Sequence, residues 1–138
     1  MSLVLLDTTF LIDAERDSGD LDAFLSDEDD VAIAAVTVAE LLVGVELAST
    51  SHRNRRRNFV EDVVNSLPVI PYDLGIAQAH AHLLAAVKRA GKPRGAHDLL
   101  IAATARATQR AVVTADVKAF EDLPGVEVRP DKEDTNTT

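Results

Sequence analysis

Residues 3–14 read LVLLDTTFLIDA, which is four apolar residues, then Asp7-Thr8-Thr9, then a second apolar stretch. A short run that is apolar at every position is typical of a strand buried on both faces of a parallel sheet. The polar Asp-Thr-Thr segment ends this strand, and the pattern after it predicts a helix to about Ala14. A strand followed at once by a helix is the repeating unit of α/β folds.

The rest of the chain repeats this order of short apolar runs and helical patterns. Strands are predicted at residues 31–36, 69–70, 111–114 and 126–128. Helices are predicted around residues 21–25 and at 37–47, 54–67, 73–90 and 96–109, with a short helix or turn at 116–123. The alternation predicts an α/β domain whose mainly parallel sheet is covered by helices on both faces. We expect one domain at residues 1–130 and a disordered tail at 131–138.

The composition limits the kinds of protein that this chain can be. Its 138 residues are 46% apolar, which is enough for one domain with a real core. The absence of cysteine excludes disulfides and thiolate metal sites. No apolar run approaches the roughly 18 residues of a membrane span. The N-terminus has no basic segment and carries Asp7, so we expect no signal peptide and a cytoplasmic location.

Four acidic residues occupy corresponding places in this pattern. Asp7 and Asp116 follow predicted strands, whereas Glu40 and Asp98 lie on the first turns of predicted helices. In a parallel sheet these places share one edge, where α/β folds bind their ligands. Each acid also has a structural explanation, since Asp is a good N-cap and an acid in a first turn suits the helix dipole. Thr37 and Glu40 match the capping-box pattern.

The four acids together point to a metal site. Carboxylates brought close together repel one another unless a cation lies among them. Mg²⁺ and Mn²⁺ suit a site built only from oxygen ligands. Such an ion can activate a water and polarise a phosphoryl oxygen, which are the requirements of a phosphodiester hydrolase.

The net charge of −9 disfavours nucleic-acid binding unless the basic residues are gathered locally. Two clusters exist, at residues 52–57 and 88–94, and either one alone is consistent with a solvated helix face. The loop with Lys92 and Arg94 directly precedes Asp98. We therefore expect Lys92 and Arg94 to contact a nucleic-acid backbone.

Four stretches of the sequence resemble the four motifs of PIN domains, and more narrowly those of VapC toxins from VapBC toxin–antitoxin systems. They are Asp7-Thr8-Thr9, Ala39-Glu40-Leu41, the stretch from Asp98 to Ala105, and Thr114-Ala115-Asp116 with Phe120 following. Order, spacing and total length agree over roughly residues 1–130. The resemblance implies a three-layer α/β/α sandwich and a Mg²⁺- or Mn²⁺-dependent endoribonuclease that cleaves RNA. It also implies a homodimer and an inhibitory VapB-like antitoxin that wraps the toxin.

The resemblance assigns roles to individual residues. Asp7 and Asp98 correspond to the main metal ligands, Glu40 to a third acid and Asp116 to a fourth. Thr8 and Thr114 correspond to hydroxyls that orient acids or water; their structural alternative is to begin a helix or end a strand.

Other functions agree less well with the sequence. A phosphatase with Asp7 as nucleophile requires a second Asp two residues later, where this chain has Thr9. A receiver-type signalling domain requires adjacent acids after the first strand, but Asp7 stands alone, and the next predicted strand is followed by Thr37. A non-catalytic binding module on the same fold remains the main alternative, although binding alone does not require all four acids.

Overall fold

The computed structural model describes residues 2–17, 25 and 28–131 of the chain. Five strands form one sheet: β1 (Leu3–Leu6), β2 (Asp30–Ala34), β3 (Val69–Ile70), β4 (Ala111–Thr114) and β5 (Val128–Pro130). The helices are α1 (Thr8–Asp17), α2 (Ala35–Leu47), α3 (Thr50–Ser66), α4 (Leu74–Ala90) and α5 (Ala96–Thr108), with a 3₁₀ turn η2 (Val117–Ala119). These elements confirm the predicted α/β order of the chain.

All strands of the sheet run parallel, in the order β3-β2-β1-β4-β5. The first strand of the chain therefore lies at the centre of the sheet, with β2 on one side and β4 on the other. Leu5 pairs with Ala32 of β2 and Val112 of β4, and all three residues are fully buried. This central position explains why LVLL is apolar at every residue.

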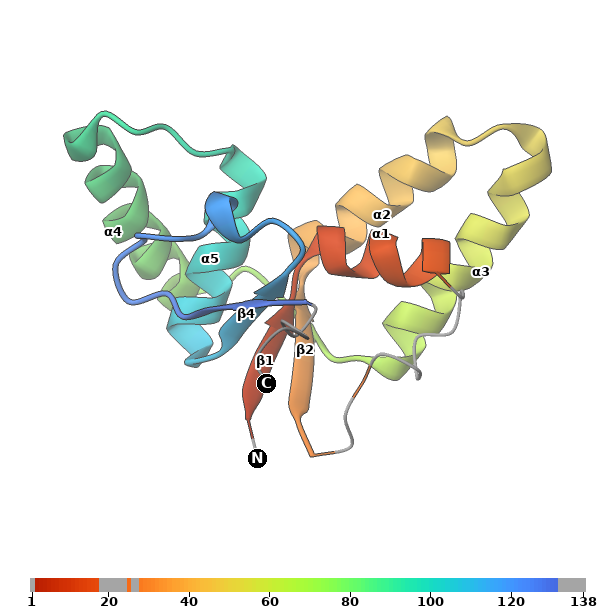
Figure 1. Ribbon diagram of the computed structural model, residues 1–138, viewed down its shortest axis with the longest axis horizontal. Helices are drawn as coiled ribbons and strands as arrows, with labels where there is room; N and C mark the ends of the chain where they lie inside the picture. Colours follow the sequence, from red (N-terminus) through yellow and green to blue (C-terminus); the bar gives the residue numbers. More distant parts are fainter. Residues whose placement is uncertain (1, 18–24, 26–27, 132–138) are drawn as a thin grey trace, which may run out of the picture.

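Helices cover both faces of the sheet, which confirms the predicted three-layer arrangement. Figure 1 shows α4 and α5 to one side of the sheet and α1, α2 and α3 to the other. Leu5 and Ala32 belong to the core that includes α4 and α5, whereas Leu6 and Ile33 belong to the core that includes α1, α2 and α3. Successive residues of one strand thus enter opposite cores, as the pleat requires.

Side chains and glycine define the ends of the longest helices. The Asp73 carboxylate accepts a hydrogen bond from the Ile76 amide at 2.9 Å and caps α4. Gly91 ends α4 with a φ of 65°, a left-handed conformation that glycine adopts without steric cost. Both ends agree with the sequence-based prediction.

Several predicted boundaries are shifted. Helix α2 begins at Ala35 rather than Thr37, and α3 begins at Thr50 rather than at residue 54. The last strand is Val128–Pro130 instead of residues 126–128, because its register is set by hydrogen bonds to β4 at the sheet edge. Pro130 is tolerated there because an edge strand leaves N–H positions unpaired. The predicted helix around residues 21–25 and the predicted tail lie outside the described residues, apart from Leu25 and Asp131.

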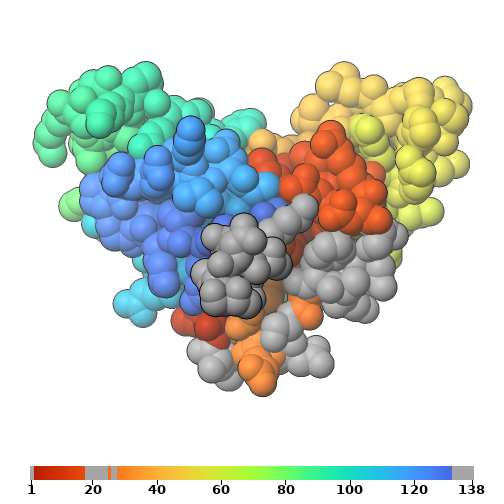
Figure 2. Space-filling view, viewed as in Figure 1, coloured from red at the N-terminus to blue at the C-terminus, as the bar shows by residue number. Residues whose placement is uncertain are grey.

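No helix in the described part of the chain is both long enough and apolar enough to cross a membrane. The space-filling view shows two lobes that stand apart at the carboxyl end of the sheet, one formed by the α4–α5 region and one by the α2–α3 region (Figure 2). The hollow between these lobes lies at the carboxyl edge of the sheet, where the sequence predicts the four acids.

Candidate active site

Asp7 is the most buried acid at this edge. It directly follows β1, is 2% exposed, and accepts the Phe10 amide at 3.0 Å as the N-cap of α1. Its other carboxylate oxygen accepts the Thr114 hydroxyl at 2.6 Å. The predicted capping role and the predicted place in the acid cluster are therefore both present in one carboxylate. Because Thr114 ends β4, this bond joins the carboxyl ends of two neighbouring strands.

Thr9 is a residue of this site that the sequence argument missed. Its hydroxyl donates to both carboxylate oxygens of Asp7, at 2.9 and 3.0 Å, and accepts the Ala115 amide at 3.1 Å. It also lies 3.2 Å from the Thr114 hydroxyl. Its position two residues after Asp7, on the first turn of α1, could have indicated this role. A short polar side chain at that position can reach back to the Asp7 carboxylate.

Thr8 supports a different acid from the one that adjoins it in sequence. Its hydroxyl donates to Glu40 Oε1 at 2.7 Å and lies 3.4 Å from the Thr37 hydroxyl, which is fully buried. The capping-box explanation of Glu40 is wrong, because α2 begins at Ala35 with Ala34 as its N-cap. Glu40 thus lies on the second turn of α2, where its carboxylate faces α1.

Asp98 lies on the first turn of α5, as predicted. A Cβ placed on Gly95, the N-cap residue, would come within 3.1 Å of Asp98 Oδ2, so the absence of a side chain at Gly95 leaves room for this carboxylate. The neighbouring His97 is 60% exposed, and its Nδ1 lies 3.6 Å from Glu40 Oε2. The start of α5 therefore meets α2 at the acid cluster.

Asp116 is the exposed member of the set. Its amide donates to the Thr114 hydroxyl at 2.9 Å, which orders the backbone after β4. Its side chain does not cap the 3₁₀ turn that follows. The predicted capping role is thus absent, and the carboxylate stays at the carboxyl edge of the sheet.

The charges of these acids act on one another. Burial raises the pKa of Asp7, and the charge of Asp98 raises it further, whereas hydrogen bonds from Thr114, the Phe10 amide and Thr9 lower it. Burial also raises the pKa of Asp98, as do the charges of Glu40 and Asp116. Asp98 thus interacts electrostatically with each of the other three acids.

The donor chemistry of this cluster fits a hydrated divalent cation. In the described part of the chain, no three acidic or histidine side chains converge closely enough to hold an ion by themselves. Mg²⁺ usually retains several waters and binds through one or two carboxylates, so it does not require a complete protein cage. A cation would also offset the mutual repulsion that raises the pKa of Asp98.

The basic residues near the site differ in whether their side chains hydrogen-bond to the backbone. Lys92 is exposed, whereas the Arg94 guanidinium donates three hydrogen bonds to backbone carbonyls. In the other basic cluster, Arg53 and Arg56 donate to the carbonyls of Ala48 and Gly44 at the end of α2. These arginines supply the positive charge that the last turn of α2 lacks.

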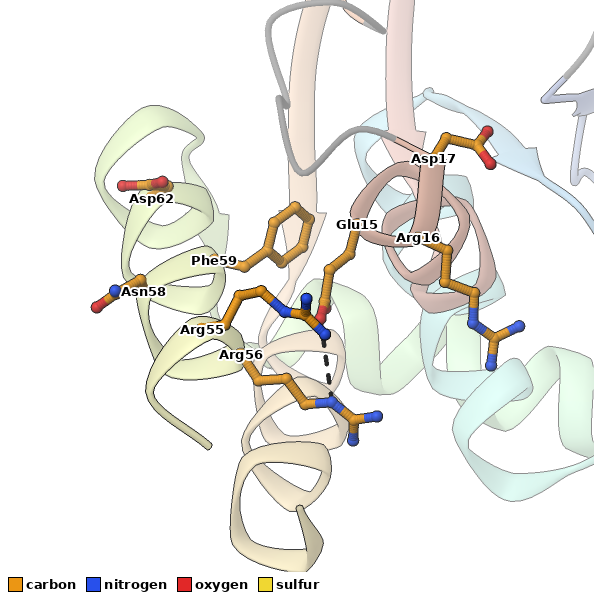
Figure 3. Close-up of a pocket in the computed structure, with 8 residues that line it drawn as sticks. All are labelled: Glu15, Arg16, Asp17, Arg55, Arg56, Asn58, Phe59 and Asp62. Carbon is orange, nitrogen blue, oxygen red and sulfur yellow. Dashed lines mark ion pairs between the residues drawn. The ribbon is translucent and has the colours of Figure 1, made fainter. Parts of the chain in front are cut away.

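One groove of the described residues lies beside the acids rather than on them. It measures ≈ 560 Å³ and runs between α1 and α3 (Figure 3). Acidic and basic side chains both line it, and Glu15 Oε1 lies 4.0 Å from Arg56 Nε across it. A narrower groove of ≈ 160 Å³ shares Glu15 and Arg56 and extends to Glu40. The acid cluster is therefore reached from the α1–α3 side as well as from the hollow between the lobes.

Known proteins share both the sequence pattern and the fold. The PIN domain family model matches residues 4–126. Ribonuclease VapC of Rickettsia bellii is 29% identical over 126 residues, which are 91% of this chain and 93% of the relative. The tRNA(fMet)-specific endonuclease VapC of Salmonella typhimurium is 32% identical over 98 residues, or 71% and 73% of the two chains.

A solved structure agrees with these relatives. The chain superposes with a TM-score of 0.76 and 30% identity on VapBC-5 of Mycobacterium tuberculosis, a member of the VapBC family of toxin–antitoxin systems, over 94% of this chain and 99% of that one. With its parallel five-stranded sheet, its hydroxyl-supported acids and these similarities, the chain belongs to the PIN domain family, among the VapC-type toxin ribonucleases.

Proposed function

We propose that this chain is a Mg²⁺- or Mn²⁺-dependent endoribonuclease, the toxin of a type II toxin–antitoxin system, which hydrolyses RNA phosphodiester bonds with a metal-activated water. The observation that carries the proposal is the arrangement at the carboxyl edge of the sheet, where Thr9 and Thr114 orient Asp7 and Thr8 orients Glu40 beside the start of α5. Repulsion among such acids is tolerated at a functional site, where a bound cation offsets it.

Asp7 and Asp98 would hold the ion most directly, with Glu40 and Asp116 completing the set. When bound, Mg²⁺ or Mn²⁺ lowers the pKa of a coordinated water and stabilises charge on the phosphoryl and leaving oxygens. Asp7 is suited to be a fixed ligand, because its carboxylate is oriented by Thr9, Thr114 and the Phe10 amide. Glu40 and Asp116 are suited to bind the ion through waters or to accept a proton.

The threonine hydroxyls keep the acids in position during this chemistry. Thr8 holds Glu40, and Thr114 holds Asp7 while it also accepts the Asp116 amide. Side chains that orient ligands in this way affect metal affinity, typically by about 10- to 100-fold. The orienting role expected of Thr8 and Thr114 thus extends to the hydroxyl of Thr9.

The substrate that we propose is RNA, as the names of the ribonuclease relatives indicate for those proteins. The exposed Lys92 lies on the loop before α5 and is suited to contact a phosphate beside the acids. The net charge of −9 makes such local cations necessary, because the chain as a whole repels a polyanion.

A VapB-like antitoxin and a second copy of the chain are the proposed protein partners. VapBC-5 of Mycobacterium tuberculosis belongs to a toxin–antitoxin family, which supports an antitoxin here. Helices α2 and α3 expose Leu42, Val43 and Val64, which are 45%, 54% and 42% exposed. Exposed apolar side chains that lie together are typical of protein interfaces.

The proposal is tested with the purified chain, free of antitoxin, and a mixed RNA pool in the presence of Mg²⁺, Mn²⁺ or chelator. Asp98→Asn removes one charge at the centre of the cluster. Glu46→Gln removes one charge from an exposed part of α2 that lines neither groove and serves as the control. We expect metal-dependent cleavage that Asp98→Asn abolishes and Glu46→Gln retains.

Two results would contradict the proposal in different ways. Normal cleavage by folded Asp98→Asn would show that the acid cluster is not the catalytic site. An absence of cleavage by the folded wild-type chain with either metal would favour a non-catalytic PIN-like binding module.

A further inference from the structure

The connection between β4 and β5 spans residues 115–127 and carries Asp116. Two arginines that lie outside this connection donate hydrogen bonds to its backbone. Arg94 precedes α5 and bonds to the part of the connection next to Asp116. Arg106 lies in the last turn of α5 and donates to the Pro124 carbonyl at 3.2 Å, near the other end. Both arginines donate to backbone carbonyls of this connection. The carbonyls that accept from Arg94 lie closer to Asp116 in the sequence than the one that accepts from Arg106.

The Arg94 guanidinium forms the more extensive attachment. One terminal nitrogen donates to the carbonyls of Lys118 and Ala119 at 3.2 and 3.0 Å, and the other donates to the Glu121 carbonyl at 2.8 Å. These three acceptors follow Asp116 by two to five residues, and Arg94 precedes Asp98 by four. One side chain therefore joins the segments that carry two of the four acids.

Asp116 depends on its backbone for its position. Its carboxylate is exposed and does not cap η2, so its side chain forms no cap that would fix it. On the β4 side, the Asp116 amide is held by the Thr114 hydroxyl. On the η2 side, the backbone is held by Arg94 and by the fully buried ring of Phe120.

The geometry of a metal site makes this attachment important. Mg²⁺ requires near-ideal octahedral geometry, and functional sites work only when their ligands are held to within about 0.5 Å. An arginine can bond several carbonyls at once through its rigid, planar guanidinium, which a lysine ammonium on a flexible stem cannot match. Three of the five Arg94 N–H donors are used in this way, so few remain for a phosphate.

We propose that Arg94 is a positioning residue that fixes the separation of Asp98 and Asp116 and thereby completes the metal site. This role replaces the predicted contact between Arg94 and RNA, which we retain for Lys92. The inference rests on the proposed metal-dependent function. The Arg94 charge also lowers the pKa of Asp98, which is consistent with a guanidinium that faces the acid cluster.

The test measures Mn²⁺ binding to the metal-free protein without RNA. The variants are Arg94→Ala, Arg94→Lys and, as the matched control, Arg106→Ala, which removes the other attachment of the same connection. We expect Arg94→Ala to weaken Mn²⁺ binding about tenfold, as loss of a ligand-orienting residue does. Arg94→Lys should recover only part of the affinity, and Arg106→Ala should bind Mn²⁺ like the wild type.

Kinetics with RNA then separates positioning from substrate contact. Arg94→Ala should lower kcat and leave KM and its salt dependence unchanged. Lys92→Ala should raise KM and make its salt dependence shallower, because a phosphate contact has been lost.

Three results would overturn the inference. Wild-type Mn²⁺ affinity in Arg94→Ala, with a higher KM and a shallower salt dependence, would make Arg94 an RNA contact. Equal weakening by Arg106→Ala would reveal a general loss of structure instead of positioning. A wild-type chain that binds no Mn²⁺ would overturn the proposed metal site itself, and the inference with it.

Discussion

The carboxyl edge and the amino edge of the central sheet, where its strands end and begin, contain opposite arrangements of charge. At the carboxyl edge, Asp98 is coupled to three other acids, and its pKa is raised. At the amino edge, Arg110 pairs with Asp30: one terminal nitrogen lies 3.0 Å from the carboxylate, and the other donates to the Asp30 carbonyl at 2.6 Å. The same guanidinium reaches the Val4 carbonyl and so joins the starts of β1, β2 and β4.

This difference shows how one sheet separates stability from function. Opposite charges at the amino edge hold the three central strands in register without contributing to the site. Like charges at the carboxyl edge repel one another and so oppose folding, and a bound cation would offset this repulsion. Substitutions at the two edges should therefore affect different properties of the protein.

The largest effect is expected from Asp7→Asn at the carboxyl edge. Loss of a fixed metal ligand should lower kcat/KM for RNA by about a thousandfold, or about 4 kcal/mol. Asparagine is also a good N-cap, so α1 should remain intact and the metal-free protein should be at least as stable as the wild type. Urea denaturation and RNA cleavage measure the two properties. A metal-free Asp7→Asn protein that unfolds readily would mean that Asp7 is chiefly structural.

Arg110→Ala removes the ion pair at the amino edge and should lower stability while leaving metal binding and catalysis unchanged. Removing a largely buried guanidinium that bonds two carbonyls and a carboxylate should cost roughly 2 kcal/mol of unfolding free energy. Mn²⁺ affinity and kcat should be unchanged in the folded fraction, since Arg110 lies at the opposite end of the strands. Reduced Mn²⁺ affinity at full folding would show that the two edges are not independent.

Thr9→Val removes one hydroxyl that supports Asp7 and keeps the shape of the side chain. The hydrogen bond from Thr9 lowers the pKa of Asp7, so its loss should raise this pKa further and weaken Mn²⁺ binding about tenfold. The acid limb of the pH–rate profile should move to higher pH. Thr9→Ser should restore both properties, and failure of the serine variant to do so would assign Thr9 to packing.

The smallest effect concerns the pH dependence of stability without metal. Burial raises the pKa values of Asp7 and Asp98 above 3.8, so the folded chain binds their protons more tightly than the unfolded chain. Stability from this source is present below 3.8 and is lost as pH rises through the folded-state pKa values. Urea denaturation should show the loss, and saturating Mn²⁺ should reverse it. A profile that Asp7→Asn and Asp98→Asn together leave unchanged would contradict this origin.

Much of the fold follows from local patterns in the sequence. The strand at LVLL and the helix predicted at residues 73–90 each depend on patterns among neighbouring residues, and both predictions are confirmed. The proximity of Asp7 and Asp116 could also be expected, because parallel strands place their carboxyl ends together. Shifts occurred where tertiary pairing decides a boundary, as at β5.

The details of the site depended on contacts that no local pattern contains. Sequence alone could not tell whether Thr8 or Thr9 supports Asp7, because both follow it directly. The structure assigns Thr9 to Asp7 and Thr8 to Glu40, which lies 32 residues away. The sequence likewise could not show that Arg94 bonds to backbone carbonyls, because these partners lie 24 to 27 residues further along the chain.

The sequence by itself determined the α/β order, the burial of the strands and the edge at which the acids meet. These properties follow from hydrophobic periodicity and from the direction of parallel strands. Only the tertiary structure decided which hydroxyl supports each acid, that Arg94 joins the segments of Asp98 and Asp116, and that Arg110 pairs with Asp30. Such pairings depend on distances of a few ångströms between distant segments, and these distances are fixed only when the helices pack on the sheet.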